Sequence, residues 1–158
     1  MRRDPIAGPE RRVVIRKYAP GDAQAVFAIS QLAPEAAQWS AASYDHGVES
    51  GQTVLVAQAG HEICGFLASR LVGTEGEILN MAVTPSQRRK SIGSMLLAAT
   101  IEEAKTKSVE RMYLEVRESN RAAVSFYEKH GFAKSGQRIG YYSGPTENAV
   151  VMEKRLTG

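Results

Sequence analysis

A short basic segment near the middle of the chain has the composition of an anion-binding turn. The first backbone N–H groups of a helix lack intrahelical partners and can face a phosphate, while small residues let the main chain approach it. Flanking cations neutralise the charge of such a ligand. The segment reads Arg88, Arg89, Lys90, Ser91, Ile92, Gly93 and Ser94, and a run rich in Leu and Ala follows it. The pattern predicts that these residues bind a phosphate-bearing ligand.

Glu115 has a setting suited to a general base. It lies in the middle of an alternating run, 111–117, on the face that also carries Tyr113 and Arg117. A carboxylate beside aromatic surface accepts a proton more readily than one in water. The alternative is an exposed carboxylate paired with Arg117 or Arg111, and the pattern alone does not separate the two hypotheses.

Tyr127 is a second candidate, on the helix that follows this strand. A phenol, with an ordinary pKa of about 10, could protonate a departing thiolate whose pKa is about 8.5. The alternative is an aromatic residue that anchors the helix to the sheet. Phe126 and Tyr127 point about 100° apart on a helix, so at most one of them faces the core squarely. Asn120 could cap the helix or contact a ligand, and the two roles are compatible.

Hydrophobic periodicity places these candidates on a succession of strands and helices. The predicted strands are 13–17, 53–58, 63–71, 77–83, 111–117, 132–138 and 149–156. The predicted helices are 23–32, a short one within 34–47, one from the basic segment to about 107, and one from about 120 to 130. Gly131 is placed to end the last helix in the left-handed conformation, and 140–148 is predicted to connect the last two strands. Consecutive strands in the first half favour an α+β fold over a doubly wound parallel one.

Composition describes an ordinary globular domain. The chain has 158 residues, 43% of them apolar and 23% charged, which is enough for one buried core. No apolar run approaches the roughly 20 residues of a membrane span, and no secretory pattern is visible, so a cytoplasmic protein is expected. Cys64 is the single cysteine, and its neighbours Ile63 and Phe66 indicate a packed thiol. The spacing of the three histidines supports no metal site.

The basic start of the chain is predicted to be a flexible tail, residues 1–12, ahead of a single domain over 13–158. Six of the 20 cations fall within the first 17 residues, so a nucleic-acid arm is the alternative. Pro5, Gly8 and Pro9 interrupt local structure there, and aromatic residues for base stacking are missing. We therefore expect no nucleic-acid or membrane partner, and either a monomer or a homodimer.

Three blocks of the sequence resemble the GCN5-related N-acetyltransferase (GNAT) superfamily, and within it the ribosomal-protein-alanine N-acetyltransferase (RimI-like) branch. Residues 88–93 resemble the acetyl-CoA signature Q/R-x-x-G-x-G/A. Residues 114–120, with Ala123 and 126–132, resemble LEVR-x-SN…A…YE-x-x-GF, which is highly specific. Tyr141-Tyr142 with 147–149 resembles the YY…EDA element of N-terminal amine acetyltransferases. The resemblance covers roughly residues 13–156.

This resemblance implies a GNAT fold: a mixed, mostly antiparallel central sheet splayed into a V and flanked by helices. Acetyl-CoA would lie in the V, between strands 77–83 and 110–117, and no metal would be needed. Its pantetheine and thioester would be held by the backbone of Met81, Ala82 and Val83. The amides of 89–94 would receive the pyrophosphate, and Asn120 would contact the CoA arm.

The resemblance also implies roles in the reaction. Glu115 would be the general base towards the incoming ammonium, and Tyr127 the general acid towards the leaving CoA sulfur. Tyr141 and Tyr142 would belong to the acceptor site. The chain departs from the family pattern at four positions, which bear on cofactor affinity and on acceptor choice. Ser91 replaces the first glycine of the signature, Asn148 replaces an aspartate, and Gly140 and Ser143 replace the asparagine and proline that commonly flank the tyrosine pair.

Three functions remain open at this point. The first is acetyl transfer to an N-terminal α-amine of a protein, for example a ribosomal protein. An α-ammonium, with a pKa of about 7.7–8.0, loses its proton for roughly 3 kcal/mol less than a lysine at about 10.4. The second is transfer to a small amine, a polyamine or an antibiotic, because acceptor specificity lies on loops such as 140–148. The third is a CoA-binding module without enzymatic activity.

Overall fold

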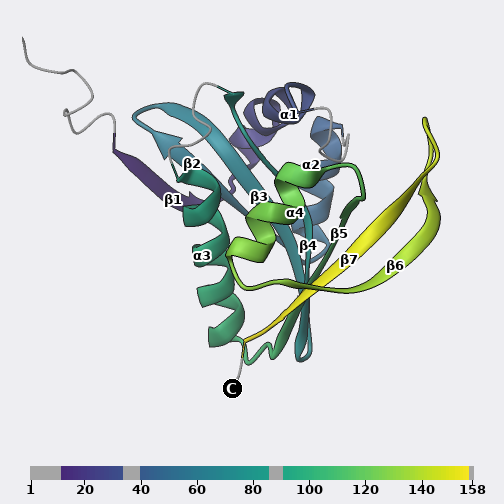
Figure 1. Cartoon of the computed structure of the whole chain (residues 1–158). Coiled ribbons are helices and arrows are strands. Elements are labelled where there is room, and N and C mark those ends of the chain that lie inside the picture. Colours follow the sequence, from purple (N-terminus) through teal and green to yellow (C-terminus); the bar gives the residue numbers. More distant parts are fainter. Residues whose placement is uncertain (1–11, 34–39, 86–90, 157–158) are drawn as a thin grey trace, which may run out of the picture. The chain divides into compact units, whose positions relative to one another are not determined.

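The computed structural model describes residues 12–33, 40–85 and 91–156. Within these ranges seven strands form one sheet in the order β1-β2-β3-β4-β5-β7-β6 (Figure 1). The strands are β1 (Val13–Lys17), β2 (Gln52–Ala59), β3 (Glu62–Val72), β4 (Glu75–Val83), β5 (Arg111–Arg117), β6 (Ala133–Tyr142) and β7 (Glu147–Arg155). The helices are α1 (Ala23–Gln31), α2 (Ala41–Glu49), α3 (Ile92–Thr106) and α4 (Arg121–Lys129). None of these helices is long and apolar enough to cross a membrane.

The sheet is mixed. β4 and β5 pair in parallel, whereas β1 with β2, β5 with β7, and β6 with β7 pair antiparallel. This confirms the α+β fold class expected from consecutive strands followed by helix crossovers.

The chain divides into two compact units. Unit 1 consists of the described residues of 1–68 and 80–100, and unit 2 of those of 69–79 and 101–158. β3, β4 and α3 each contribute residues to both units. The predicted single domain over 13–158 stays a prediction, and nearly all of the predicted tail lies outside the described residues.

The core of unit 1 joins α1 and α2 to the sheet. Tyr44 of α2 is fully buried, and its ring meets Phe66 of β3 edge-on with 5.5 Å between centroids. The cluster consists of Val26, Ile29, Ala33, Tyr44, Val56, Phe66 and Ala82. Such alternating and helical apolar positions are what the periodicity predicts.

Gly65 sets the distance between β3 and the start of α3. A Cβ at this position would lie 3.2 Å from Ile92 Cγ2, 3.3 Å from Leu96 Cδ1 and 3.3 Å from the Ala82 carbonyl oxygen. The absence of a side chain therefore lets the first turns of α3 pack directly on the strand.

Asp22 fixes the entry to α1. Arg16 donates to both of its carboxylate oxygens, at 2.9 and 3.0 Å, and the Ala19 N–H donates at 2.7 Å. The hydrogen bond from Arg16 holds the pKa of Asp22 below its ordinary value. The Asp22 side chain is only 11% exposed, so its charge depends on these partners.

Unit 2 is built on β5, whose alternation is as predicted. Met112 and Leu114 are buried on one face, and β5 runs antiparallel to β7 with Glu115 opposite Val151. The chain then enters α4 and leaves it at Gly131, whose φ of +94° is the expected left-handed helix end.

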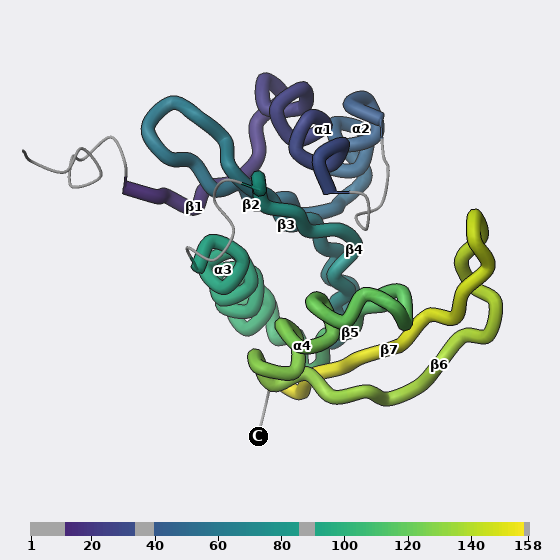
Figure 2. The backbone as a smooth tube through the Cα atoms, turned by 45° about the horizontal axis from the view of Figure 1, so that its top comes forward, coloured from purple at the N-terminus to yellow at the C-terminus, as the bar shows by residue number. Residues whose placement is uncertain are grey.

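The last hairpin differs from the prediction. Residues 140–148 were expected to form a connection, but β6 extends to Tyr142 and β7 starts at Glu147, so the connection is only 143–146. β6 is the outermost strand, and all of its residues from 133 to 141 are exposed. It carries no buried apolar face from which periodicity could be read, which is why the strand was underestimated. Figure 2 shows β6 and β7 side by side as a long hairpin.

Candidate functional site

The residues predicted to hold the cofactor lie in unit 1. Met81, Ala82 and Val83 end β4, with Ala82 buried and the other two half-buried. Ile92, Gly93 and Ser94 form the first turn of α3, and the Met95 N–H donates to the Ser91 carbonyl at 2.9 Å. The structure thus puts a helix start where the sequence predicted it. Arg88, Arg89 and Lys90 lie outside the described residues.

Ser91 adopts a left-handed backbone conformation with φ of +65°. This conformation suits glycine, whereas a residue with a Cβ adopts it at a cost of about 1–2 kcal/mol. The family pattern has glycine here, so the departure keeps the backbone shape and adds strain. Ser108, after α3, is the other described non-glycine residue with positive φ, at +62°.

Thr84, which directly follows β4, supplies a polar atom without a partner among the described residues. Its backbone N–H donates to the Cys64 carbonyl at 2.9 Å, but its Oγ1 is buried and has no hydrogen-bond partner among the described residues. A buried hydroxyl is normally satisfied, so an unpaired one indicates a missing partner. Together with a helix start, whose first N–H groups have no intrahelical acceptor, this fits a phosphate-bearing cofactor.

Glu115 pairs with neither of the two arginines, Arg111 and Arg117, that the sequence offered as partners. Arg111 binds Glu153 at 3.2 Å, and Arg117 is engaged elsewhere. The partner of Glu115 is Arg138 of β6, whose Nε–H donates to Oε2. The Glu115 side chain is only 16% exposed, so the idea of an exposed surface carboxylate is wrong.

Arg117 holds the connection between β6 and β7. Its guanidinium binds Glu147 at 3.2 Å and donates to the carbonyls of Pro145 (3.3 Å) and Ser143 (3.2 Å). Glu147 also accepts from the Ser119 N–H at 2.5 Å, and its pKa is lowered by Ser119 and by Arg117. This network ties the hairpin to the end of β5.

The two tyrosines of the hairpin lie at the end of β6. Tyr141 is 53% exposed and Tyr142 is half-buried, with their ring centroids 5.0 Å apart and the rings nearly perpendicular. The Arg117 guanidinium carbon lies 4.5 Å from the Tyr142 centroid. Burial, and after it the charge of Glu115, raise the pKa of Tyr142. Tyr142 and Glu115 therefore share one region of unit 2.

The departures at Gly140 and Asn148 are coupled. Gly140 has φ of +61°, and its N–H donates to Asn148 Oδ1 at 2.9 Å. Glycine and asparagine both tolerate this conformation, so the replacement of asparagine by glycine is compatible with the turn. The Asn148 amide oxygen accepts a bond that an aspartate could also accept.

Tyr127 is buried in unit 2, with 5% of its surface exposed. Its ring packs edge-on against Phe126 and Phe132, at 5.1 and 5.5 Å between centroids. Burial raises its pKa well above the ordinary value, which keeps the phenol protonated at neutral pH. Tyr127 thus anchors α4 through its aromatic ring, as one of the two sequence hypotheses predicted. Its phenol also retains a proton that it could donate.

Asn120 caps α4, since its Oδ1 accepts from the Ala123 N–H at 3.1 Å. The side-chain NH₂ group is not used by this cap, so capping leaves two donors for a ligand.

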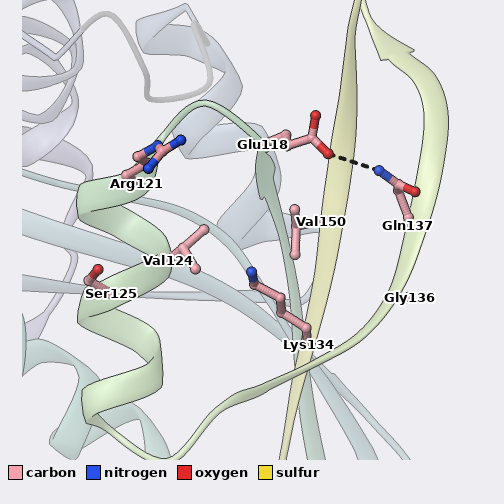
Figure 3. A pocket seen from close by; sticks show the side chains of 8 residues that line it. All are labelled: Glu118, Arg121, Val124, Ser125, Lys134, Gly136, Gln137 and Val150. Atoms are coloured by element: carbon pink, nitrogen blue, oxygen red, sulfur yellow. Dashed lines mark hydrogen bonds between the residues drawn. The ribbon is translucent and has the colours of Figure 1, made fainter.

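A pocket of about 580 Å³ opens in unit 2 between α4 and the hairpin (Figure 3). Val124 and Val150 are its buried apolar residues, and Glu118 accepts from the Gln137 amide at 2.9 Å across it. Arg121, Ser125, Lys134 and Gly136 complete the lining. None of the predicted site residues lines this pocket.

Cys64 is buried, with 2% of its surface exposed, and its Sγ donates to the Ala57 carbonyl at 3.4 Å. Burial raises the pKa of the thiol, and the prediction of a packed cysteine is confirmed.

The sequence analysis missed Arg138 and Thr84 as components of the site, whereas Glu147 belongs to the YY…EDA element that it identified. Arg138 lies 23 residues after Glu115, and no local spacing signals a contact made across an intervening strand. Thr84 could have been suspected, because a polar residue ends an otherwise apolar strand.

Comparison with known proteins agrees with this geometry. A family model described as the Acetyltransferase (GNAT) family matches residues 23–132, and the chain belongs to this family of N-acetyltransferases. Ribosomal protein bS18-alanine N-acetyltransferase of Salmonella typhimurium is 34% identical over 135 residues, which are 83% of this chain and 89% of that protein. The corresponding enzyme of Haemophilus influenzae is 41% identical over 95 residues, but the match spans 64% of its length.

Solved structures give the same result. The ribosomal-protein alanine N-acetyltransferase of Escherichia coli superposes with a TM-score of 0.83 at 26% identity, covering 93% of this chain and 96% of that one. Ard1 of Thermoplasma volcanium gives 0.82 at 28% identity, with 92% and 99% covered. The resemblance deduced from the three sequence blocks is confirmed.

Proposed function

We propose that this enzyme transfers the acetyl group of acetyl-CoA to the N-terminal α-amine of a protein, and that a ribosomal protein is its acceptor. The observation that carries the proposal is the similarity to a bS18-alanine N-acetyltransferase along 83% of the chain. The tyrosine pair on the β6–β7 hairpin, with Glu115 nearby, supports an acceptor site for a peptide terminus.

The cofactor assignment rests on unit 1. Acetyl-CoA would supply an activated thioester when bound. The start of α3 offers backbone N–H groups that would serve its phosphates, and Thr84 Oγ1, which has no hydrogen-bond partner among the described residues, would serve them too. The backbone of Met81, Ala82 and Val83 would hold the pantetheine arm, and the NH₂ group of Asn120 would contribute a further donor.

Glu115 would receive the proton of the incoming ammonium, directly or through a water. An α-ammonium has a pKa of about 7.7–8.0, so this deprotonation costs little at neutral pH. The α-amine is therefore the favoured acceptor group over a lysine side chain at about 10.4.

Tyr127 would donate to the leaving sulfur. Its raised pKa keeps the proton in place but makes complete transfer to a thiolate of pKa about 8.5 unfavourable. We therefore assign to the Tyr127 O–H the role of stabilising negative charge on the sulfur by a hydrogen bond. The proton itself would pass to the sulfur only when the thiolate is also desolvated, because desolvation raises the pKa of the thiol.

Mass spectrometry of peptides with Ala, Ser or Met termini, incubated with enzyme and acetyl-CoA, tests the proposal. Each peptide carries one internal lysine, and a copy with a blocked α-amine serves as the matched control. We expect acetylation at the α-amine alone, and its loss by at least 100-fold in Glu115→Gln and by at least 10-fold in Tyr127→Phe, with CoA binding intact. Acetylation confined to lysine side chains or to small amines such as spermidine would contradict the proposed acceptor.

A further inference from the structure

Arg138 lies outside the three motif blocks, yet it contacts the proposed base. Its Nε–H donates to Glu115 Oε2, and the two charges form an ion pair. The two arginines of β5 are committed elsewhere: Arg111 to Glu153, and Arg117 to Glu147. Among the described residues, Arg138 is the cation that the structure gives to Glu115.

The register of the hairpin makes this contact possible. Glu115 lies opposite Val151 of β7, which in turn lies opposite Gly136 of β6, and Arg138 lies opposite Ala149. With about 4.8 Å between neighbouring strands, β5 and β6 are roughly 10 Å apart. Gly136 has no side chain and Ala149 only a methyl group, so an arginine can reach over β7 to the carboxylate. Arg138→Gln shortens the side chain and removes its charge, so it abolishes this ion pair.

Arg138 also joins the base to the tyrosine pair. Its guanidinium carbon lies 5.5 Å from the Tyr141 ring centroid, and Tyr141 contacts Tyr142 edge-on. Glu115 and the two aromatic rings are thereby linked through one side chain. That side chain is 59% exposed, so the link lies at the surface of the hairpin.

We propose that Arg138 is a positioning residue for acetyl transfer: it holds the Glu115 carboxylate in one rotamer beside the hairpin tyrosines. An acceptor amine would then meet an ordered base. One carboxylate oxygen is used by Arg138, which leaves the other for the proton. The inference rests on the proposed role of Glu115 as base. Loss of such ordering lowers the rate of the chemical step, because a misplaced reacting group costs up to 100-fold.

Steady-state kinetics of the full chain with an Ala-terminal peptide tests this role. Arg138→Gln should lower kcat by about 10–100-fold and change the acceptor KM by less than about twofold. Arg138→Lys, which retains charge and length, should recover most of the rate. Arg111→Gln is the matched control, since it removes another arginine–glutamate ion pair from the same sheet, between β5 and β7, and leaves Glu115 unchanged. CoA binding by calorimetry should be unchanged in all three variants.

A double-mutant cycle separates this inference from the proposed function. If Arg138 acts through Glu115, adding Arg138→Gln to Glu115→Gln should cost no further rate. Equal losses in the two backgrounds, an unchanged kcat in the single variant, or a rise in KM alone would overturn the positioning role. Full activity of Glu115→Gln would instead overturn the base assignment itself.

Discussion

Replacing Ser91 with glycine tests whether the strained turn before α3 exists in the folded enzyme before the cofactor binds. The serine has φ of +65°, which costs a residue with a Cβ about 1–2 kcal/mol. Glycine removes this cost but loses about 0.5–1 kcal/mol through the greater freedom of its unfolded chain. The net gain in the free energy of unfolding is about 1 kcal/mol, which raises Tm by about 2–4 °C for a chain of this size.

The effect on CoA affinity follows from when the strain arises. The positive φ is a property of the folded turn, and strain that is present both before and after the cofactor binds cancels in the binding free energy. We expect the dissociation constant for CoA, measured by calorimetry, to change by less than about twofold. If the free enzyme instead relaxed to negative φ, the same 1 kcal/mol would be released on binding and affinity would rise about fivefold.

Ser108→Gly is the matched control, because Ser108 has nearly the same φ, +62°, and lies beyond the far end of α3. It should raise Tm by a similar amount and leave CoA binding unchanged. Ser91→Ala keeps the Cβ and should show no gain in stability. A fivefold tighter complex without any gain in Tm for Ser91→Gly would refute the reasoning, as would a fall in Tm.

Two further predictions concern the packing of unit 1. Asp22→Asn should lower the free energy of unfolding at pH 7 by about 1–2 kcal/mol, because the pKa of Asp22 is lowered by Arg16 and its charge stabilises the fold above the ordinary pKa of about 3.9. The difference from wild type should shrink as pH falls below about 4, and urea titrations at pH 7 and pH 3 that gave equal differences would contradict this. Gly65→Ala should lower stability by about 1–3 kcal/mol, since its Cβ would crowd Ile92, Leu96 and the rigid Ala82 carbonyl. Gly21→Ala, where an added Cβ meets nothing within 4 Å, should be nearly neutral in the same thermal melts.

Elements with an apolar face could be predicted from the sequence. The bounds of β5 agree with the predicted strand. Helix α4 begins directly after the cap residue Asn120 and ends at Lys129, two residues before Gly131, as these two residues indicated. The alternation of β5 reflects one buried face, and the glycine marks a backbone that few other residues adopt. The strained Ser91 could also be anticipated, because a serine replaced a glycine in a recognisable signature.

Contacts within the hairpin could not be predicted in the same way. β6 is exposed along almost its whole length, so its residues carry no periodic signal. Its register with β7 depends on local features such as the bond from Gly140 to Asn148, and a shift of that register would move Arg138 away from Glu115. The ion pair is therefore a property of the tertiary structure, and no spacing in the sequence encodes it.

The burial of Cys64 has a practical consequence for assays of this enzyme. Acetyl transfer releases the free thiol of CoA, which aromatic disulfide reagents detect, and the protein's single cysteine is shielded from them. The folded enzyme should contribute no background colour, even at high enzyme concentration. The same thiol becomes reactive once unit 1 opens, so the rate at which the reagent labels Cys64 in the absence of substrate reports the opening of the core.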